Sequence, residues 1–159
     1  MGTWVKEAFT FQDLQRIMSR LIDRVPVFAE LSQQELIDLL ANAEKCTFAP
    51  GDAILNEGST GHFMYVMMEG AATVAKKGRG GQASELAALG SGDSFGEMSL
   101  VDKDPRSASV TATADCVLIR IPESACWKNP VVSAKIFRNI SRILSRRLRE
   151  ADRTLLQQA

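Results

Sequence analysis

The middle of the chain is built from short apolar runs separated by glycines, and this pattern most limits the fold. Between Cys46 and Ile121 the runs are rich in Val, Ile, Phe, Tyr and Thr, residues that favour strands. The turns between them are marked by Pro50-Gly51, Gly58, Gly61, Gly70, Gly78 to Gly81, Gly90 and Gly92. Such punctuation predicts a small antiparallel barrel or jelly roll. Within it, Lys76 to Gln82 is expected to form a flexible, solvent-exposed hairpin loop.

Helical patterns flank this region on both sides. On the N-terminal side, Thr10 and Asp13 have the spacing of a capping box, and apolar residues then recur at helical intervals. A first amphipathic helix is therefore predicted from Phe11 to Arg24. Ser32 and Glu35 repeat the capping pattern and open a second helix. Both apolar faces are interpreted as packing surfaces, although the first helix could also dock a partner protein.

A longer helix is predicted at the C-terminal end, where Asn129 can cap and Pro130 suits the first helical position. An apolar stripe runs along it at three- and four-residue intervals, formed by Ile136, Ile140, Ile143, Leu144, Leu148, Ala151 and Leu155. This stripe must be buried against the roll of the same chain or against the stripe of a second copy. The solvent-facing sides are expected to carry Arg138, Arg142, Arg146, Arg149 and Arg153.

One acid and one arginine stand on either side of a short turn late in the strand region. The two segments are Phe95-Gly96-Glu97-Met98-Ser99-Leu100 and Asp104-Pro105-Arg106-Ser107-Ala108-Ser109-Val110. The forked guanidinium of Arg106 matches two phosphate oxygens, whereas the carboxylate of Glu97 only accepts hydrogen bonds and so suits a sugar hydroxyl. Gly96 lets the backbone approach a ligand closely. Together they predict a site for a ribose that carries a cyclic phosphate. The competing interpretation is a buried ion pair between Glu97 and Arg106 that holds the loop without any ligand.

This pair of segments resembles the phosphate-binding cassette of the cyclic-nucleotide-binding domain family, which includes the bacterial catabolite activator, the regulatory subunit of cAMP-dependent protein kinase and nucleotide-gated channels. The resemblance extends from about Pro26 to Arg153, and it takes in Ala49-Pro50-Gly51-Asp52, Asn56-Glu57-Gly58, Gly61-His62-Phe63-Met64-Tyr65-Val66 and Glu69-Gly70. It implies an α+β, mainly β fold: a small antiparallel β-roll of the jelly-roll type, flanked by N-terminal helices and by a C-terminal helix that acts as a lid or a dimer seam. It also implies an N-terminal helical extension over residues 1–25 and a cyclic-nucleotide-binding domain over residues 26–159.

The resemblance implies a role for each residue of the cassette. Glu97 would bind the ribose 2'-hydroxyl, Arg106 the exocyclic phosphate oxygens and Ser107 a further phosphate oxygen. The backbone amides of Gly96 and Ala108 would complete the cradle. The ligand-binding residues predicted in this way are Phe95, Gly96, Glu97, Met98, Ser99, Arg106, Ser107, Ala108 and Val110.

Recognition of the base is where the sequence departs from the family pattern. In the catabolite-activator branch, hydroxyl residues just past an Arg-Arg-Leu run reach the adenine. Here Arg146-Arg147-Leu148 is followed by Arg149, Glu150, Ala151 and Asp152, and Thr154 is the only nearby hydroxyl. Asp152 could accept a hydrogen bond from the adenine amino group, and Arg149 could stack on the base. Ser107 is compatible with either cAMP or cGMP, and cAMP is the favoured ligand.

Composition argues against several other classes of protein. Cys46, Cys116 and Cys126 are odd in number and lack CxxC spacing, which argues against a disulfide framework and a zinc site. His62 is the only histidine, so a metal-dependent enzyme of the cupin type and metal-assisted hydrolysis of the nucleotide are disfavoured. The sequence has no run of eighteen apolar residues and no signal-peptide pattern. A cytoplasmic protein without a membrane span, a metal or catalytic residues is therefore expected.

Charge is distributed unevenly along the chain, although the net charge is zero. From Lys128 onward there are eight basic and two acidic residues, so this end carries +6 and the first 127 residues carry −6. A neutral total disfavours a general nucleic-acid binder. Because the chain ends at Ala159 without a helix-turn-helix module, direct DNA binding is not expected.

The sequence therefore predicts a sensor module that binds a cyclic nucleotide, with cAMP favoured, and signals through its C-terminal helix to a separate effector protein of unknown identity. A homodimer through that helix is compatible with the pattern, although the arginines beside the stripe favour a lid that packs on its own domain. The alternative is a family member that has lost nucleotide binding and acts as a structural, dimerisation or interaction module.

Overall fold

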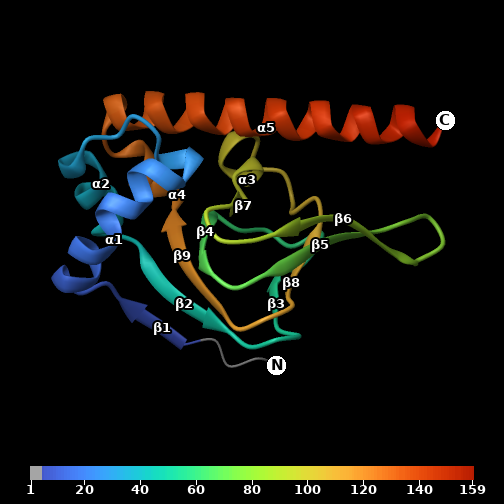
Figure 1. Cartoon of the computed structure of the whole chain (residues 1–159), viewed down its shortest axis with the longest axis horizontal. Helices are drawn as coiled ribbons and strands as arrows, with labels where there is room; N and C mark the ends of the chain where they lie inside the picture. The colour runs from blue at the N-terminus through green and yellow to red at the C-terminus, as the bar shows by residue number, and fades with distance from the viewer. Residues whose placement is uncertain (1–4) are drawn as a thin grey trace.

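Two antiparallel sheets form the centre of the molecule (Figure 1), within residues 5–159 that the computed structural model describes. The first sheet has the order β1-β2-β9-β4-β7, and its strands are β1 (Val5–Ala8), β2 (Glu44–Phe48), β9 (Cys116–Pro122), β4 (Phe63–Glu69) and β7 (Ser94–Phe95). The second has the order β3-β8-β5-β6, with β3 (Ala53–Leu55), β8 (Ser109–Ala112), β5 (Ala72–Lys77) and β6 (Ala83–Leu89). This arrangement confirms the predicted β-roll of the α+β, mainly β class.

The first sheet is the middle layer, because its central strands bury side chains on both faces. In β4, Met64 and Val66 belong to one apolar core, whereas Tyr65 and Met67 belong to the other. β9 alternates in the same way. Successive side chains of a strand point to opposite faces, so strands buried on both sides read as continuous apolar runs. One core lies between this sheet and the helices, and the other lies between the two sheets.

Short helices cover the outer face of the first sheet. They are α1 (Phe11–Arg24), the 3-10 turn η1 (Pro26–Phe28), α2 (Gln33–Leu40) and α4 (Glu123–Trp127). The two predicted capping boxes are formed, by Thr10 with Asp13 at α1 and by Ser32 with Glu35 at α2. These reciprocal hydrogen bonds satisfy backbone N–H groups that a helix start would otherwise leave without a partner. The predicted bounds of the first helix are confirmed.

The longest helix, α5 (Pro130–Gln158), lies along one side of the roll and continues past α3 and β7 (Figure 1). Asn129 caps it as predicted, with its side-chain oxygen 2.9 Å from the backbone nitrogen of Val131. Pro130 occupies its first turn, where no backbone N–H is needed. The predicted C-terminal helix is therefore confirmed.

The first half of α5 is packed into the helical core. Ile136 and Ile140 are buried there. Between them, the side-chain amide of Asn139 donates hydrogen bonds to the backbone carbonyls of Val27 (3.1 Å) and Ala29 (2.8 Å). These two bonds tie α5 to the η1 segment. These hydrogen bonds fix the position of α5, in addition to the burial of its apolar face.

The second half of α5 leaves its part of the predicted stripe uncovered. Leu148 and Leu155 are 64% and 65% exposed. Residues 148–159 are all exposed to solvent. In this structure the second half of the stripe therefore does not pack on the roll of its own chain.

Residues 5–8 form a strand that the sequence pattern did not predict. β1 pairs with β2 in antiparallel register, from Val5 opposite Thr47 to Ala8 opposite Glu44. Four residues are too few for a two-residue alternation to be recognised in a sequence. The segment interpreted as a helical extension thus supplies both α1 and an edge strand. The division of the chain at residue 25 stays a prediction, and residues 1–4 of that segment lie outside the described part.

β5 and β6 form a hairpin whose far end extends away from the rest of the second sheet (Figure 1). Its turn is closed by a 2.9 Å hydrogen bond from the backbone nitrogen of Gly78 to the carbonyl of Gln82. Gly81 adopts φ +77°, a conformation that favours glycine. Residues 76–82 are exposed, which confirms the predicted solvent-exposed hairpin loop.

Candidate functional site

The acidic segment of the cassette makes a tight turn between β7 and a single helical turn, α3 (Met98–Val101). Phe95 on β7 is buried and stacks on Tyr65 of β4, with ring centroids 5.4 Å apart and an interplanar angle of 10°. Gly96 follows with φ +77°, which residues with a side chain rarely adopt. Glu97 then begins α3. The glycine turns the backbone so that Glu97 lies inside the protein.

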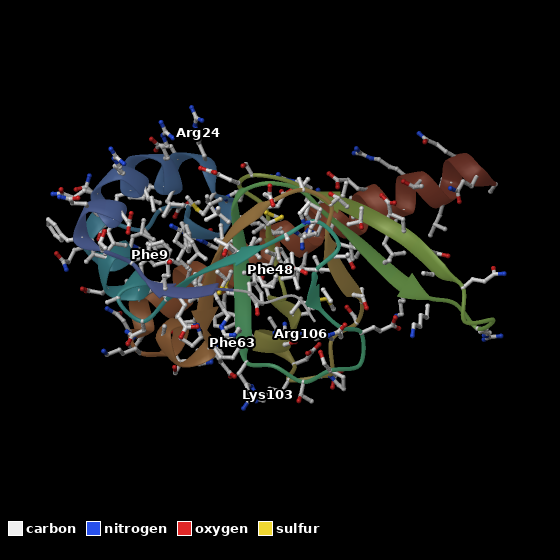
Figure 2. The ribbon with its side chains drawn as sticks, turned by 90° about the horizontal axis from the view of Figure 1, so that it is seen from below. Phe9, Arg24, Phe48, Phe63, Lys103 and Arg106 are labelled. Atoms are coloured by element: carbon white, nitrogen blue, oxygen red, sulfur yellow. The ribbon has the colours of Figure 1, made fainter. Side chains whose placement is uncertain are left out.

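Arg106 lies behind this turn with its guanidinium buried. Its two terminal nitrogens each donate a hydrogen bond of 2.7 Å, one to the carbonyl of Gly96 and one to the carbonyl of Phe63. Figure 2 labels Arg106 and Phe63, which the second of these hydrogen bonds brings close together. Burial lowers the pKa of Arg106, yet an arginine remains charged at physiological pH. The side chain thus joins the cassette to the start of β4.

Two glycines leave the space that the guanidinium occupies. A Cβ atom on Gly61 would lie 2.8 Å from one terminal nitrogen of Arg106, and a Cβ atom on Gly96 would lie 2.8 Å from the other. Both distances are well below van der Waals contact, so any other residue would displace the arginine. Gly96 was predicted as part of the site. Gly61 was noted as a turn residue and within a segment that carries the family resemblance, but not as a site residue, because nothing in the sequence shows that it faces Arg106.

Glu97 is the most deeply buried acid of the cassette, at 1% exposure. Its Oε1 accepts a 2.5 Å hydrogen bond from a terminal nitrogen of Arg147, whereas its Oε2 is buried without a hydrogen-bond partner among the described residues. Burial raises the pKa of Glu97, and the positive charges of Arg147 and Arg106 oppose this rise. A buried carboxylate oxygen without a partner is costly, so the site is suited to a molecule that donates a hydrogen bond there.

Arg147 is the residue that sequence reasoning missed. It lies on α5 and reaches the cassette from the other side, with one nitrogen on Glu97 and the other on the backbone carbonyl of Ser94. The Arg146-Arg147-Leu148 run was recognised, but only the residues after it were given a role. The position of Arg147 in the apolar stripe could have revealed it: counting from Ile140 and Leu144 in steps of three and four brings Arg147 to the inner face.

The structure places the other predicted site residues in three kinds of surroundings. Ser99 and Val110 are buried, and Val110 belongs to the core between the sheets. Met98 and Ser107 are exposed, with the Ser107 hydroxyl 3.9 Å from the Met98 sulfur. Ala108 is half-buried. Because Ser107 is exposed, its hydroxyl is accessible to a ligand. The binding role of each stays a prediction.

Arg149 and Asp152 are not brought to the cassette. Both are exposed, and Arg149 lines a hollow on another face of α5. The α5 residue that contacts the cassette is Arg147. The proposed contacts of Arg149 and Asp152 with a base thus require α5 to change its position.

The ion pair between Glu97 and Arg106, which was the competing interpretation, is not formed among the described residues. Arg106 bonds to two carbonyls, and Glu97 bonds to Arg147 instead. The protein partners of these two groups come from β4 and α5 as well as from the cassette itself.

The remaining sequence features lie apart from the cassette centre. His62 is exposed, and its Nδ1 is 3.1 Å from the Glu123 carboxylate. The three cysteines are free and buried. Residues 5–159 contain no group of three or more His, Cys, Asp or Glu side chains placed to hold a metal. Over the same range, every helix is too short or too polar to span a bilayer.

A comparison with family models identifies the fold and the cassette together. The model described as the cyclic nucleotide-binding domain matches residues 45–128, which include both cassette segments. The chain belongs to the cyclic nucleotide-binding domain family. The predicted resemblance is confirmed.

Relatives in this family include regulators of different kinds. The chain is 34% identical to the "Cyclic AMP receptor protein" of Thermus thermophilus over 80% of its own length and 59% of that protein. It is 31% identical to the "cAMP-dependent protein kinase regulatory subunit" of Hypocrea atroviridis over 77% of its own length and 27% of that protein. The chain thus spans less than two thirds of each of these two relatives.

The fold is also that of a solved member of the family. A cyclic nucleotide-binding domain from Methylobacillus flagellatus superposes with a TM-score of 0.85 and 22% identity, over 98% of this chain and 89% of that one. At this identity the likeness concerns the fold alone. It extends to nearly all of the chain, including the regions outside residues 45–128.

Proposed function

We propose that this chain is a regulatory module that binds cAMP in the cassette and transmits binding through α5 to a separate protein. The observation that carries the proposal is the buried Oε2 of Glu97, which has no hydrogen-bond partner among the described residues and lies in the cassette shared with Arg106. A ribose hydroxyl would donate to that oxygen and remove its desolvation penalty. The names of the two relatives at 34% and 31% identity both refer to cAMP, which favours this nucleotide over cGMP.

The phosphate would be bound on the opposite side of the turn. The two hydrogen bonds described for the Arg106 side chain leave most of its five N–H donors for an anion. The exposed hydroxyl of Ser107 and the backbone amides of Gly96 and Ala108 would add neutral donors around the phosphate oxygens. No side chain in this set acts on a phosphodiester bond, so the nucleotide is expected to leave unchanged.

Binding would reach α5 through Arg147. Because Arg147 already donates to Oε1 of Glu97, a ribose hydroxyl on Oε2 would share the carboxylate with the helix. The second half of α5 would then change position relative to the roll, and its exposed leucines would contact an effector or a second copy. Direct DNA binding is not part of the proposal, and a cytoplasmic location remains its expected setting.

A second candidate function follows from the protein contacts of the two charged cassette side chains. Arg106 and Glu97 both have protein partners, so the chain could act as an interaction module that does not bind nucleotide. Calorimetric titration of the whole chain separates the two candidates. One binding event with cAMP supports the sensor, and no heat at millimolar cAMP supports the interaction module.

The decisive variant is Arg106→Lys, which keeps the charge but removes the fork that matches two phosphate oxygens. We expect the affinity for cAMP to fall by about tenfold or more. Lys103→Ala, in the same exposed loop, is the control and should bind like the parent chain. Thermal unfolding without nucleotide, recorded for both variants, separates lost binding from lost fold. Equal affinity of Arg106→Lys and the parent would exclude Arg106 as the phosphate ligand.

A further inference from the structure

A row of arginines runs along the solvent-facing side of α5, away from the cassette. Its members recur every three or four residues and are all exposed: Arg138, Arg142, Arg146, Arg149 and Arg153. Together with Ser141, Ser145 and Glu150 they line an open hollow of about 550 Å³. Residues at this spacing share one face of a helix. The row is therefore a continuous basic surface roughly four turns long.

The first part of this surface is already occupied by carboxylates of the same chain. Arg138 and Arg142 both bind Glu30, and the Arg142 contact is 3.3 Å. One turn earlier on the same face, Lys135 binds Glu35 at 2.7 Å. Hydrogen bonds and charges from the two arginines lower the pKa of Glu30. The α5 surface thus pairs with glutamates supplied by another segment.

The second part of the row continues at the same spacing without such partners. Among the described residues, no ion pair or side-chain hydrogen bond involves Arg146, Arg149 or Arg153. This is also the part of α5 that extends past α3 and β7 (Figure 1). Three guanidinium groups on neighbouring turns repel one another, and Glu150, the carboxylate that lines the same hollow, offsets only part of their charge.

We propose that Arg146, Arg149 and Arg153 form a docking site for an acidic segment of a partner protein, with carboxylates at helical spacing. The forked guanidinium binds carboxylates in a bidentate manner, which a segment with glutamates three and four residues apart could match at each turn. The binding of Glu30 and Glu35 on the first part of the row is the precedent within this molecule. The inference concerns a different face from the cassette, and it does not depend on nucleotide binding.

Two other anionic partners fit the surface less well. Single-stranded nucleic acids stack their bases on aromatic side chains, and none lines the hollow. A membrane surface that bound this part of α5 would have to contact the exposed leucines as well as the arginines. Leu148 and Leu155 lie roughly 140° around the helix from the centre of Arg146, Arg149 and Arg153, given about 100° per residue, so one flat surface does not contact both sets.

The test uses a fluorescein-labelled, alanine-rich helical peptide with glutamates three and four residues apart. A second peptide has the same composition with its glutamates in one block. Fluorescence polarisation with the whole chain at low salt should show tighter binding of the spaced peptide. The triple variant Arg146→Glu/Arg149→Glu/Arg153→Glu should weaken it by about tenfold or more. The milder variant Arg146→Gln/Arg149→Gln/Arg153→Gln should bind the spaced peptide with intermediate affinity. It retains good helix formers at all three positions.

A matched control reverses three basic charges elsewhere. Lys76→Glu/Lys77→Glu/Arg79→Glu on the exposed β5–β6 hairpin changes the net charge by the same amount. It should bind the spaced peptide within about twofold of the parent. If both triple variants lost the same affinity for the spaced peptide, the effect would come from net charge alone, and the proposal would be overturned. It would also be overturned if the two peptides bound equally, or if a single-stranded oligonucleotide or phosphatidylserine vesicles bound this surface more tightly than the spaced peptide.

Discussion

The two halves of α5 have similar sequence patterns but different surroundings. The first half is fixed by buried isoleucines and by Asn139, whose amide bonds to two carbonyls of the η1 segment. The second half exposes Leu148 and Leu155, and Arg147 at its start bonds to Glu97 and Ser94 of the roll. A regular apolar stripe thus does not guarantee burial along its whole length. The difference locates a candidate moving part next to Glu97, the acid proposed to bind the ribose.

The largest expected effect separates the two halves by stability. Ile140→Ala should lower the free energy of unfolding by about 2–5 kcal/mol, because it leaves a cavity in the helical core. Leu155→Ala, on the exposed half, should change it by less than about 0.5 kcal/mol. Urea unfolding of both variants measures this contrast. A comparable loss for Leu155→Ala, especially one that grows with protein concentration, would mean that a second copy buries this half in solution.

The second prediction concerns the contact between α5 and the cassette. Arg147→Ala should destabilise the nucleotide-free protein by about 1–3 kcal/mol, since it leaves the buried carboxylate of Glu97 without its charge partner. Arg146→Ala, one residue earlier and exposed, is the matched control and should have little effect. Thermal unfolding at neutral pH compares them. If both variants unfold like the parent chain, Arg147 does not hold α5 to the cassette.

A smaller effect is expected from removing the second half altogether. Truncation after Arg147 keeps the cassette and its arginine contact, so cAMP should still bind, a few-fold more weakly. The ratio of cAMP to cGMP affinity should fall, because the phosphate and ribose contacts do not distinguish the bases. Calorimetry with both nucleotides measures the ratio. An unchanged ratio would show that the second half does not read the base.

The smallest effect is a dependence of stability on pH. Burial raises the pKa of Glu97 above its ordinary value of 4.5, so the folded protein binds this proton more tightly than the unfolded chain does. Protonation therefore favours folding: the contribution of Glu97 to the free energy of unfolding should increase as the pH falls from the raised pKa toward 4.5. Glu97→Gln should lack this contribution. Parallel pH profiles for the parent and Glu97→Gln would contradict the raised pKa.

The fold was largely readable from the sequence because its signals are local. Capping boxes, glycine turns and the apolar runs of β4 and β9 each depend on residues close together in the chain. β1 was missed because it is short and is specified by its pairing with β2. Local patterns of this kind carry no information about which strand an edge strand will join.

The candidate site was readable only in part, for a related reason. Glu97 and Arg106 stand near each other in the sequence and have distinctive chemistry. Gly61 and Arg147 take part through contacts that span long stretches of chain. The apolar stripe could have placed Arg147 on the inner face of α5. Its partner, and the whole role of Gly61, become visible only when α5 and the turn before β4 are placed against the cassette.

The central claim is that cAMP moves the second half of α5 while the first half stays fixed. Spin labels at Ser84→Cys on β6 paired with either Ala134→Cys or Gln157→Cys test it, since all three positions are exposed and the native cysteines are buried. Distances measured by pulsed electron–electron double resonance, with and without cAMP, should change between positions 84 and 157 and stay the same between positions 84 and 134. If cAMP binds and both distances stay the same, or both change together, α5 does not transmit binding in the way described.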